Sequence, residues 1–500
     1  MAEKIFGAVD FGATSGRVIE VRLDGNNKLS FDVTHRFKDL SVQIFDVSHL
    51  CTDAMYAEAL EGLSMLGHRH KEVASIGIDT WGVDYCLFDK FNFMTPSHLS
   101  ARSSSWFRDY VGQLYEIVPP KELYFATGTQ LMMNSIFRLF AVSRKYPEIF
   151  ARAEYMLTLP GVFNFYLTGE KFADTSYVTT MQMYKADHSG WNFDLLAKVG
   201  LPAKLFLPVT RPGEVRVDLL PQVVERTGLR GTKLTSVASH DTGSAVTATP
   251  TLEKDFLFVS SGTVSIMGTE IIGTIVNQAS YEQNMANEGG AFGTNKLLKN
   301  ITGMFVLEEL RREWQRRGID ADYGHLLAQA RVAPPLSAFI DANSPEFTEI
   351  PGSMQEKIDA FLKKTGQPAP SAPGHYVRVV LESLAMKYRY IADIFREARG
   401  IDFSTLHVIG GGSRNNMMNQ FAANAVNAEV IAGPEEATSI GNAMVQIAAE
   451  EGISSLSDLR SLLISSLPPQ RFSPNPSERA AWEDAYGWFL ANINWVHKNP

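Results

Sequence analysis

The stretch that decides the fold is Ile5-Phe-Gly-Ala-Val-Asp10-Phe-Gly-Ala-Thr-Ser-Gly-Arg17, which Val18-Ile-Glu-Val-Arg-Leu23 follows directly. Two apolar runs flank a turn of glycine and hydroxyl residues, which predicts a β-hairpin with a tip of small residues. Backbone N–H groups at such a tip suit phosphate oxygens, and Arg17 adds positive charge. Asp10 ends the first strand, where it could hold Mg²⁺ through water. An ordinary turn with a solvated arginine is the alternative.

A second hairpin of the same plan is predicted from Asp255-Phe-Leu-Phe-Val-Ser-Ser-Gly-Thr-Val-Ser-Ile-Met-Gly268, with its tip at Ser260-Ser-Gly-Thr263. Two such hairpins about 250 residues apart indicate a duplicated domain that grips one phosphorylated ligand from both sides. Chance similarity is the alternative, because a strand, a turn and a strand are a common combination.

A reactive pair lies just before the second hairpin, in Val237-Ala-Ser-His-Asp-Thr-Gly-Ser-Ala-Val246. Val237 and Ala238 are interpreted as the end of a buried strand, and the small residues from Gly243 as the first turns of a helix. A carboxylate at such a corner is held rigidly, as a general base requires, which makes Asp241 the candidate base. A helix cap that bonds nearby backbone N–H groups is the alternative role for Asp241.

A tryptophan lies between two aspartates after another apolar run, in Val73-Ala-Ser-Ile-Gly-Ile-Asp79-Thr-Trp-Gly-Val-Asp84. An aromatic ring suits the C–H face of a sugar, and carboxylates suit its hydroxyls. Trp81 as a simple core residue is the alternative.

The remaining chain is predicted mainly from hydrophobic spacing and breaks. Residues 121–207 are mainly helical, with a break at 157–161 and a short helix at 194–200. The other expected elements are a flexible glycine-rich stretch (287–293), a helix (304–317), a surface excursion around one short helix (333–374), a long helix (376–399), a strand running into three glycines (406–412) and its following helix (413–424), a strand (430–434), a small-residue helix from 436, and a terminal helix (478–496).

Composition bounds the class of protein. The chain has 500 residues, which favours two or more domains. A net charge of −9 argues against a nucleic-acid or anionic-membrane partner. The two cysteines, Cys51 and Cys86, fit a reducing, cytoplasmic location. No Walker-type P-loop, protein-kinase catalytic loop or zinc motif occurs, so any phosphate binding falls to the paired hairpins.

Five motifs occur in one order, and together they resemble the FGGY family of carbohydrate kinases. They are Asp10-Phe-Gly-Ala-Thr-Ser-Gly-Arg17, Gly77-Ile-Asp-Thr-Trp-Gly-Val-Asp84, Ser239-His-Asp-Thr242, Ser260-Ser-Gly-Thr263 and Gly410-Gly-Gly412. The resemblance covers residues 5–460, and the second and third motifs are the specific ones. Asn287-Glu-Gly-Gly, Leu298-Lys-Asn-Ile301 and Val430-Ile-Ala-Gly-Pro-Glu435 extend it toward the members that phosphorylate L-rhamnulose.

The resemblance implies an α/β fold with two ribonuclease-H-like domains of the actin and hexokinase type and an ATP cleft between them. The expected boundaries are an N-terminal domain at 1–247, a C-terminal domain at 248–475 and a helical tail at 476–500. The implied reaction transfers the γ-phosphoryl group of ATP, with Mg²⁺, to a primary hydroxyl of a ketose. A sugar and ATP are the expected partners, and a homodimer is left open.

The resemblance also implies the roles of individual residues. Asp241 would be the base and Asp10 the metal residue. The residues expected around the sugar are Asp79, Trp81, Gly82, His240, Thr242 and Asn300. The residues expected at ATP are Ala13, Thr14, Ser15, Gly16, Arg17, Thr263, Glu308 and Gly411.

Some positions depart from the family pattern. Ser100-Ala-Arg102 lacks the acid of the usual Asp-x-Arg motif, Glu308 stands for a glutamine, Val264 for a tryptophan and Phe292 for an acid. These departures leave the sugar open among L-rhamnulose, L-fuculose and xylulose. A nucleotide-binding relative that has lost turnover is the alternative from another class.

Overall fold

The computed structural model describes residues 3–13, 15–38, 40–45, 47–95, 100, 106–348 and 352–493. The predictions for Thr14, Ala101, Arg102 and Trp495 lie outside these residues. The chain divides into two compact units, each assembled from separate segments. The first unit comprises residues 1–252, 270–298 and 436–468, and the second comprises 253–269, 299–435 and 469–500. The predicted domain boundaries were continuous in sequence and stay a prediction.

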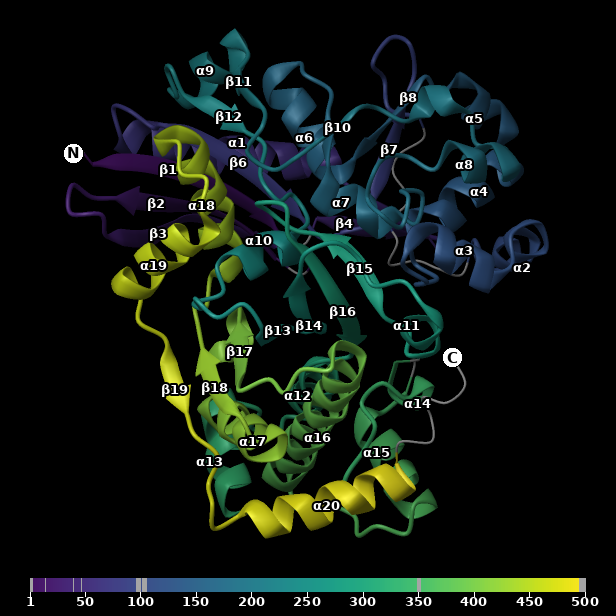
Figure 1. The fold of residues 1–500 in the computed structure, drawn as a ribbon, viewed down its shortest axis with the longest axis vertical. Helices are drawn as coiled ribbons and strands as arrows, with labels where there is room; N and C mark the ends of the chain where they lie inside the picture. Colours follow the sequence, from purple (N-terminus) through teal and green to yellow (C-terminus); the bar gives the residue numbers. More distant parts are fainter. Residues whose placement is uncertain are drawn as a thin grey trace. The chain divides into compact units, whose positions relative to one another are not determined.

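The first unit is built on a mixed sheet (Figure 1). Its strands, in spatial order, are β11 (Arg216–Asp218), β12 (Lys233–Thr235), β6 (Ser75–Thr80), β1 (Lys4–Phe11), β2 (Ser15–Leu23) and β3 (Leu29–Lys38). β1 and β2 form the predicted antiparallel hairpin, and β1 pairs in parallel with β6. The apolar runs give a β1 that is buried along nearly its whole length, as a central strand requires.

Shorter strands and helices complete the first unit. The strand pairs are β4 (Ser41–Ile44) with β5 (Val47–Leu50), β7 (Tyr85–Phe88) with β8 (Tyr155–Thr158), β9 (Ala173–Asp174) with β10 (Val209–Thr210), and β15 (Ala286–Gly289) with β16 (Asn295–Ile301). The helices are α1 (Thr52–Arg69), α2 (Arg108–Ile117), α3 (Pro120–Thr127), α4 (Ser135–Lys145), α5 (Pro147–Arg152), α6 (Leu159–Thr168), α7 (Thr175–Val178), η1 (Thr179–Met181), α8 (Phe193–Lys198), η2 (Ala203–Leu205), α9 (Pro221–Thr227), α10 (Asp241–Thr247), α11 (Gln278–Glu282), α18 (Ala437–Glu451) and α19 (Leu456–Ser466).

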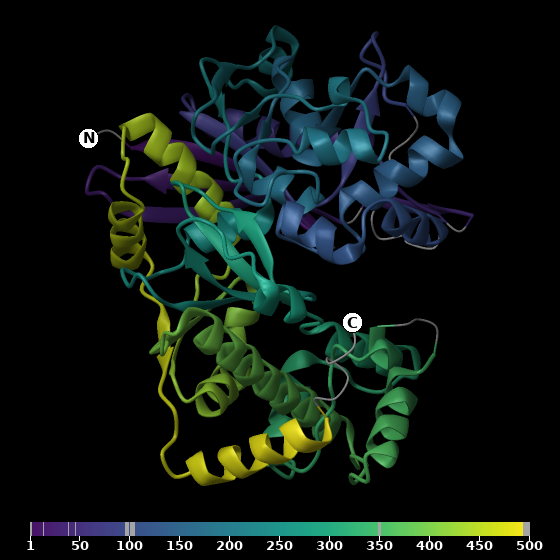
Figure 2. The same ribbon diagram turned by 45° about the vertical axis from the view of Figure 1, so that its right-hand side comes forward.

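Helix α18 comes from late in the chain and packs against the first strands. Figures 1 and 2 show it in yellow-green beside the purple strands of the sheet. It also packs on α10, and a Cβ at Gly441 would overlap the carbonyl oxygen of Ser244. The absence of a side chain at Gly441 therefore sets how closely the two helices approach.

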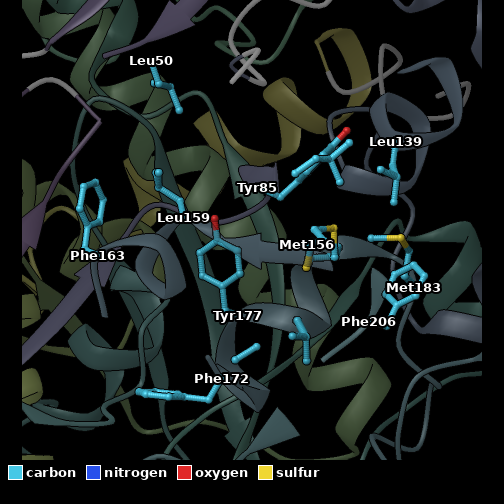
Figure 3. Close-up of a cluster of buried hydrophobic side chains, with 14 of the residues drawn as sticks. Leu50, Tyr85, Leu139, Met156, Leu159, Phe163, Phe172, Tyr177, Met183 and Phe206 are labelled. Carbon is cyan, nitrogen blue, oxygen red and sulfur yellow. The ribbon is translucent and has the colours of Figure 1, made fainter. Parts of the chain in front are cut away.

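The core of the first unit is rich in aromatic and methionine side chains (Figure 3). Tyr177 is fully buried within it, and its hydroxyl donates a 2.7 Å hydrogen bond to the carbonyl oxygen of Asp84. Because a buried hydroxyl needs a partner, this bond ties the core to the segment that follows β6. Most aromatic residues of 121–207 are buried.

The second unit repeats the plan of the first sheet. Its strands lie in the order β14 (Ser265–Ile271), β13 (Leu257–Ser260), β17 (Thr405–Ile409), β18 (Glu429–Ala432) and β19 (Gln470–Phe472). β13 and β14 form the predicted hairpin, and β13 pairs in parallel with β17. Each unit therefore has a hairpin whose first strand continues the sheet through a later, parallel strand.

The helices of the second unit gather around one long helix. They are α12 (Phe305–Arg316), α13 (Tyr323–Val332), α14 (Pro345–Thr348), α15 (Met354–Lys364), α16 (Pro373–Arg399), η3 (Gly411–Arg414), α17 (Asn416–Val426) and α20 (Arg479–Asn492). Helix α16 starts with proline and ends at Gly400, whose φ of 63° is left-handed, and α13 and α17 pack on it. Among the described residues, no helix is both long and apolar enough to cross a membrane.

Three local predictions are wrong. Residues 333–374 were expected to form a surface excursion around one short helix, but they include both α14 and α15. Phe339, Ile340 and Phe361 are buried, because apolar side chains between the prolines pack into the core.

The other two wrong predictions concern stretches of small residues. The stretch from Asn287 was expected to be flexible, but residues 286–289 form the buried strand β15. Strand β12 ends at Thr235, so Val237 and Ala238 lie in a buried connection instead of a strand. In both places a small-residue sequence hides tertiary packing, because close backbone contact substitutes for large apolar side chains.

Candidate functional site

Two aspartates meet at the ends of parallel strands in the first unit. Asp10 on β1 is the register partner of Asp79 on β6, and both are buried. Burial raises the pKa of Asp10 to about 6, which the Arg17 guanidinium opposes and the charge of Asp241 reinforces. Burial also raises the pKa of Asp79 well above its usual value, and repulsion from Asp10 adds to the shift. These couplings place Asp10, Asp79 and Asp241 in one electrostatic neighbourhood.

Arg17 links the hairpin to a carboxylate from the C-terminal part of the first unit. Its Nη2 lies 2.8 Å from Asp10 Oδ2, and its Nε lies 2.9 Å from Glu436 Oε2. Arg36 Nη2 lies 2.6 Å from the other oxygen of Glu436. Of the tip residues expected at phosphate, Ala13 is exposed and Ser15 half-buried, whereas Gly16 is buried against Phe37.

Asp79 is held by a polar ladder along α18. Asn442 Nδ2 donates to Asp79 Oδ2 at 2.5 Å, and Gln446 Nε2 donates to Asn442 Oδ1 at 2.7 Å. Gln446 Oε1 accepts from Ser75 Oγ, which closes the ladder against β6. The other oxygen of Asp79, Oδ1, is buried and has no hydrogen-bond partner among the described residues.

Asp241 begins helix α10, and the residue before it is bridged to the sheet. The backbone N–H of Thr80 donates to Ser239 O at 2.9 Å, and Thr80 and His240 form a parallel bridge. His240 is the N-cap residue, and no side chain caps the helix. Asp241 Oδ1 instead accepts from the N–H of Thr242 at 2.5 Å and from its hydroxyl at 3.1 Å. The alternative that Asp241 caps N–H groups near Gly243 is therefore wrong.

The two oxygens of Asp241 are unequal. His240 Nε2 also faces Oδ1, at 3.3 Å, so all three contacts of the carboxylate go to that oxygen. No described residue donates a hydrogen bond to Oδ2, and the side chain is 29% exposed. An oxygen with free lone pairs on a fixed carboxylate is what a general base presents to an incoming hydroxyl.

His240 is buried between charged side chains. Its Nδ1 lies 3.1 Å from Glu288 Oε2, and Lys296 Nζ lies 3.3 Å from the same oxygen. Burial would raise the pKa of Glu288, but attraction to His240 and Lys296 outweighs burial and lowers it to about 2. Glu288 is therefore ionised at neutral pH.

Trp81 and Gly82 follow β6 beside this histidine. Trp81 is partly exposed, and its Nε1 donates to Asp84 Oδ2 at 2.7 Å. Asp84 is buried, and Arg138 Nη1 lies 2.6 Å from its Oδ1. A Cβ at Gly82 would lie 3.1 Å from His240 Nε2, so only glycine leaves that nitrogen uncrowded. The partly exposed Trp81 ring is thus held in place by the buried ion pair of Asp84 and Arg138.

The second unit carries the other predicted residues. Thr263 lies at the β13–β14 tip, where its carbonyl oxygen accepts from Phe305 N–H at 3.0 Å. Glu308 on α12 makes two 3.0 Å contacts with Arg311 Nη1. Gly411 is exposed, with open space where a Cβ would stand. Asn300 lies in the last residues of β16, which from residue 299 belong to the second unit. It is half-buried, and its carbonyl oxygen accepts from Asn343 Nδ2 at 3.3 Å.

A metal ion fits the strand ends of the first unit on the chemistry of the donors. Asp10 and the unpartnered oxygen of Asp79 supply carboxylates on adjacent strands. Among the described residues no group of three histidine, cysteine, aspartate or glutamate side chains could hold a metal ion alone. Mg²⁺ is usually held by one or two carboxylates together with waters and substrate phosphates, so it does not need a third.

The structure therefore gathers most of the predicted residues of the first unit into one neighbourhood, and it adds others that sequence reasoning missed. Glu288, Lys296, Glu436 and Asn442 are the additions. Glu288 and Lys296 are register partners across the β15–β16 hairpin, so opposite charges on either side of a glycine-rich turn were a usable signal. Asn442 and Gln446 are four residues apart on a small-residue helix, which was a second signal.

Comparisons with known proteins give a consistent picture across the chain. The sequence model of the N-terminal domain of the FGGY family of carbohydrate kinases matches residues 5–248, and that of the C-terminal domain matches residues 257–450. A rhamnulokinase from Bacteroides thetaiotaomicron is 35% identical over 96% of this chain and 98% of its own length. A rhamnulokinase from Enterococcus faecalis is 32% identical over 94% of each chain.

Solved structures share the fold at low sequence identity. A gluconate kinase from Lactobacillus acidophilus superposes with a TM-score of 0.81 at 16% identity, covering 100% of this chain and 99% of its own. A glycerol kinase from Plasmodium falciparum, solved with ADP, gives 0.77 at 15% identity and covers 99% of each chain. The predicted two-part α/β fold of the actin and hexokinase type is confirmed.

Proposed function

The chain belongs to the FGGY family of carbohydrate kinases, and we propose that it transfers the γ-phosphoryl group of ATP to the primary hydroxyl of L-rhamnulose, giving L-rhamnulose 1-phosphate. Membership of the family makes it an ATP-dependent carbohydrate kinase. The two relatives named rhamnulokinases, at 35% and 32% identity over nearly the whole chain, support L-rhamnulose as the acceptor. We also propose a cytoplasmic location, which the free thiols of Cys51 and Cys86 support.

The observation that carries the proposed chemistry is the unequal Asp241 carboxylate. Within the part of the chain that the structure describes, every hydrogen-bonding or ionic contact of this side chain goes to Oδ1, and Oδ2 is left to accept a proton. In the proposed step, the sugar hydroxyl gives its proton to Oδ2 while its oxygen bonds to the γ-phosphorus of ATP. The bond from that phosphorus to the β–γ bridging oxygen breaks, and ADP leaves. Such a transfer depends on positioning and charge stabilisation, which fixed side chains supply.

The residues around Asp241 would orient the sugar. The partly exposed ring of Trp81 suits a C–H face of the sugar. Gly82 has no side chain to crowd His240, so its backbone is open to a sugar hydroxyl. Asp10 and Asp79 would hold Mg²⁺, which when bound neutralises charge on the phosphates. Arg17, Thr263, Glu308 and Gly411 stay proposed ATP contacts.

A coupled assay for ADP release tests the proposal. We expect L-rhamnulose to give a higher kcat/KM than L-fuculose or xylulose, and Asp241→Asn to lower kcat by roughly 10²- to 10⁴-fold, the range for a lost general base. Asp218→Asn, an exposed acid on β11, is the matched control and should keep full activity. A tenfold preference for another ketose would overturn the substrate. Sugar binding without sugar-stimulated ADP release would instead favour a relative that has lost turnover.

A further inference from the structure

A row of buried charges runs behind the proposed base. Lys296, Glu288, His240 and Asp241 follow one another at 3.3, 3.1 and 3.3 Å, from Nζ to Oε2, from Oε2 to Nδ1 and from Nε2 to Oδ1. The first three side chains are at most 7% exposed, whereas Asp241 is 29% exposed. The row therefore leads from the interior of the first unit to the partly exposed carboxylate.

Both ring nitrogens of His240 face carboxylate oxygens. An ionised carboxylate only accepts hydrogen bonds, so Glu288 can bond Nδ1 of the imidazole only when that nitrogen carries a proton. Nε2 faces a second carboxylate oxygen, Asp241 Oδ1. A bare Nε2 lone pair would meet that oxygen unfavourably, whereas an Nε2–H would donate to it. Each ring nitrogen therefore faces an acceptor that only an N–H could use.

The strand that carries Glu288 is held rigidly. A Cβ at Gly289 would lie 2.7 Å from the carbonyl oxygen of Thr175, and the Gly289 N–H donates to Thr179 Oγ1 at 2.9 Å. The neighbouring Ser176 Oγ accepts from the His240 backbone N–H at 3.2 Å. One segment, residues 175–179, therefore fixes both the backbone of His240 and the strand that supplies its partner.

Lys296 lies against the helix that carries the base as well as against Glu288. A Cβ at Gly243 would lie 3.4 Å from Lys296 Nζ, which puts the ammonium beside the first turn of α10. Since a positive charge beside Glu288 disfavours a second positive charge on His240, Lys296 limits the effect of the carboxylate. Glu288 Oε2 therefore lies between two groups, Lys296 and His240, that compete for its negative charge.

We propose that Glu288, balanced by Lys296, is a positioning residue that keeps His240 protonated on both nitrogens and directs its Nε2–H to Oδ1 of Asp241, so that Oδ2 takes the proton of the sugar hydroxyl. The proposal rests on the proposed role of Asp241 as the base. Neither Glu288 nor Lys296 touches the reacting atoms, so both act through His240. Glu288 fixes the donor, and the donor fixes which oxygen of the base is free.

Several charged groups face His240 or its partners, and each contributes to the pH dependence. Those in the row itself are Asp241 on α10, Glu288 on β15 and Lys296 on β16. Asp174 on β9 accepts from Ser239 and Ser176, and His188 interacts electrostatically with Glu288 and bonds Asn295 at 2.8 Å. Asp10 and Asp79 act on Asp241 from the strand ends.

The pH profile of kcat/KM for sugar-stimulated ADP release tests the positioning role with two opposite substitutions. Glu288→Gln removes the charge that stabilises the imidazolium, so the alkaline limb should move to lower pH by about one to three units. Lys296→Met removes the opposing charge, so the same limb should move to higher pH. A purely structural role would lower activity at every pH and leave both limbs in place, and that result would overturn the proposal.

A matched control and a second readout keep the test decisive. Glu20→Gln removes a buried carboxylate from another histidine of the first unit, His70, whose Nε2 lies 2.8 Å from Glu20 Oε2. That variant should leave the profile unshifted. If Glu288→Gln does not fold, the upward shift in Lys296→Met still decides the question.

Histidine-labelled NMR observes His240 without any sugar, using the signal that disappears in His240→Gln among the 11 histidines. We expect its Nδ1 to stay protonated across neutral pH and its titration to move down in Glu288→Gln and up in Lys296→Met. A titration that ignores both substitutions would overturn the positioning role even in an active enzyme. If no sugar supports ADP release, the proposed function fails, while the NMR titration still decides whether Glu288 controls His240.

Discussion

Arg17 faces Asp10 across the β1–β2 hairpin, where the two are register partners and Nη2 lies 2.8 Å from Oδ2. The same guanidinium uses Nε to contact Glu436 at 2.9 Å. One planar cation therefore joins a strand of the N-terminal sheet to the start of α18. A lysine ammonium lacks the second, separately directed nitrogen and cannot reproduce both contacts.

We expect Arg17→Met to destabilise the protein by about 3–5 kcal/mol, because it leaves two buried carboxylates without their shared cation. Urea unfolding measures the change. Arg36→Met is the control: its side chain is half exposed and contacts Oε1 of Glu436, so about 1 kcal/mol or less should be lost. Equal losses in the two variants would contradict the bridging role of Arg17.

We expect Gly441→Ala to be strongly destabilising and to lower sugar-stimulated ADP release. A Cβ there overlaps Ser244 O, so α18 and α10 must separate, and α10 carries Asp241. Overpacking of this kind costs about 1–3 kcal/mol or more. Gly112→Ala on α2 is the matched helix substitution with open space around it, and it should stabilise by about 0.5–1 kcal/mol. Thermal unfolding of both variants is the measurement, and a neutral Gly441→Ala would refute the close approach.

We expect Trp81→Phe to raise KM for the sugar more strongly than it changes the free energy of unfolding. The substitution removes the Nε1–H that bonds Asp84 Oδ2, so the ring loses its fixed orientation. Steady-state kinetics and urea unfolding are measured together. Trp191→Phe also removes an indole hydrogen bond, to Leu207 O, from the core of the same unit. It should cost similar stability, and a matching rise in KM there would show that the Trp81 effect is not local.

The pKa of Glu288 predicts an acid-dependent stability. Attraction to His240 and Lys296 outweighs burial and holds this pKa at about 2, below the ordinary value of 4.5. A depressed carboxyl pKa contributes stability that is fully present above pH 4.5 and is lost as pH falls toward 2. Glu288→Gln should therefore be less stable than the parent by on the order of 3 kcal/mol at pH 7, with the gap narrowing below pH 4.5. Urea unfolding at pH 7, 5 and 3.5 checks this, and a gap that is constant with pH would contradict it.

The sequence pattern predicted secondary structure well where an element is determined by its own residues and their close neighbours in the chain. The strands around residues 5–10 and 18–23, the second hairpin and the long helix ending at Gly400 follow from alternation, apolar spacing and a glycine stop. The stretch at 286–289 did not follow, because its burial comes from contact with residues 175–179, far away in sequence. Small residues packed backbone to backbone give the same sequence signal as a mobile loop.

The candidate site was predictable in its motif residues and not in their support. Asp10, Asp79 and Asp241 were singled out as acids at the ends or corners of apolar strands. Glu436 and Asn442 were not, because their roles depend on α18 packing onto β1 and β6, which no local pattern encodes. For Asp241 the sequence left base and cap as alternatives; the donors on Oδ1 rule out the cap near Gly243, and the role of base stays a proposal.

The return of residues 436–468 to the first unit has a consequence for how the protein is made. Until α18 leaves the ribosome, the carboxylate of Asp79 has no amide from Asn442, and the carbonyl of Gly7 has no donor from Gln446. While most of the remaining chain is synthesised, these polar groups of Asp79 and Gly7 therefore lack their donors from α18. A fragment made from the first half of the gene would lack α18, one of the helices that cover its own core.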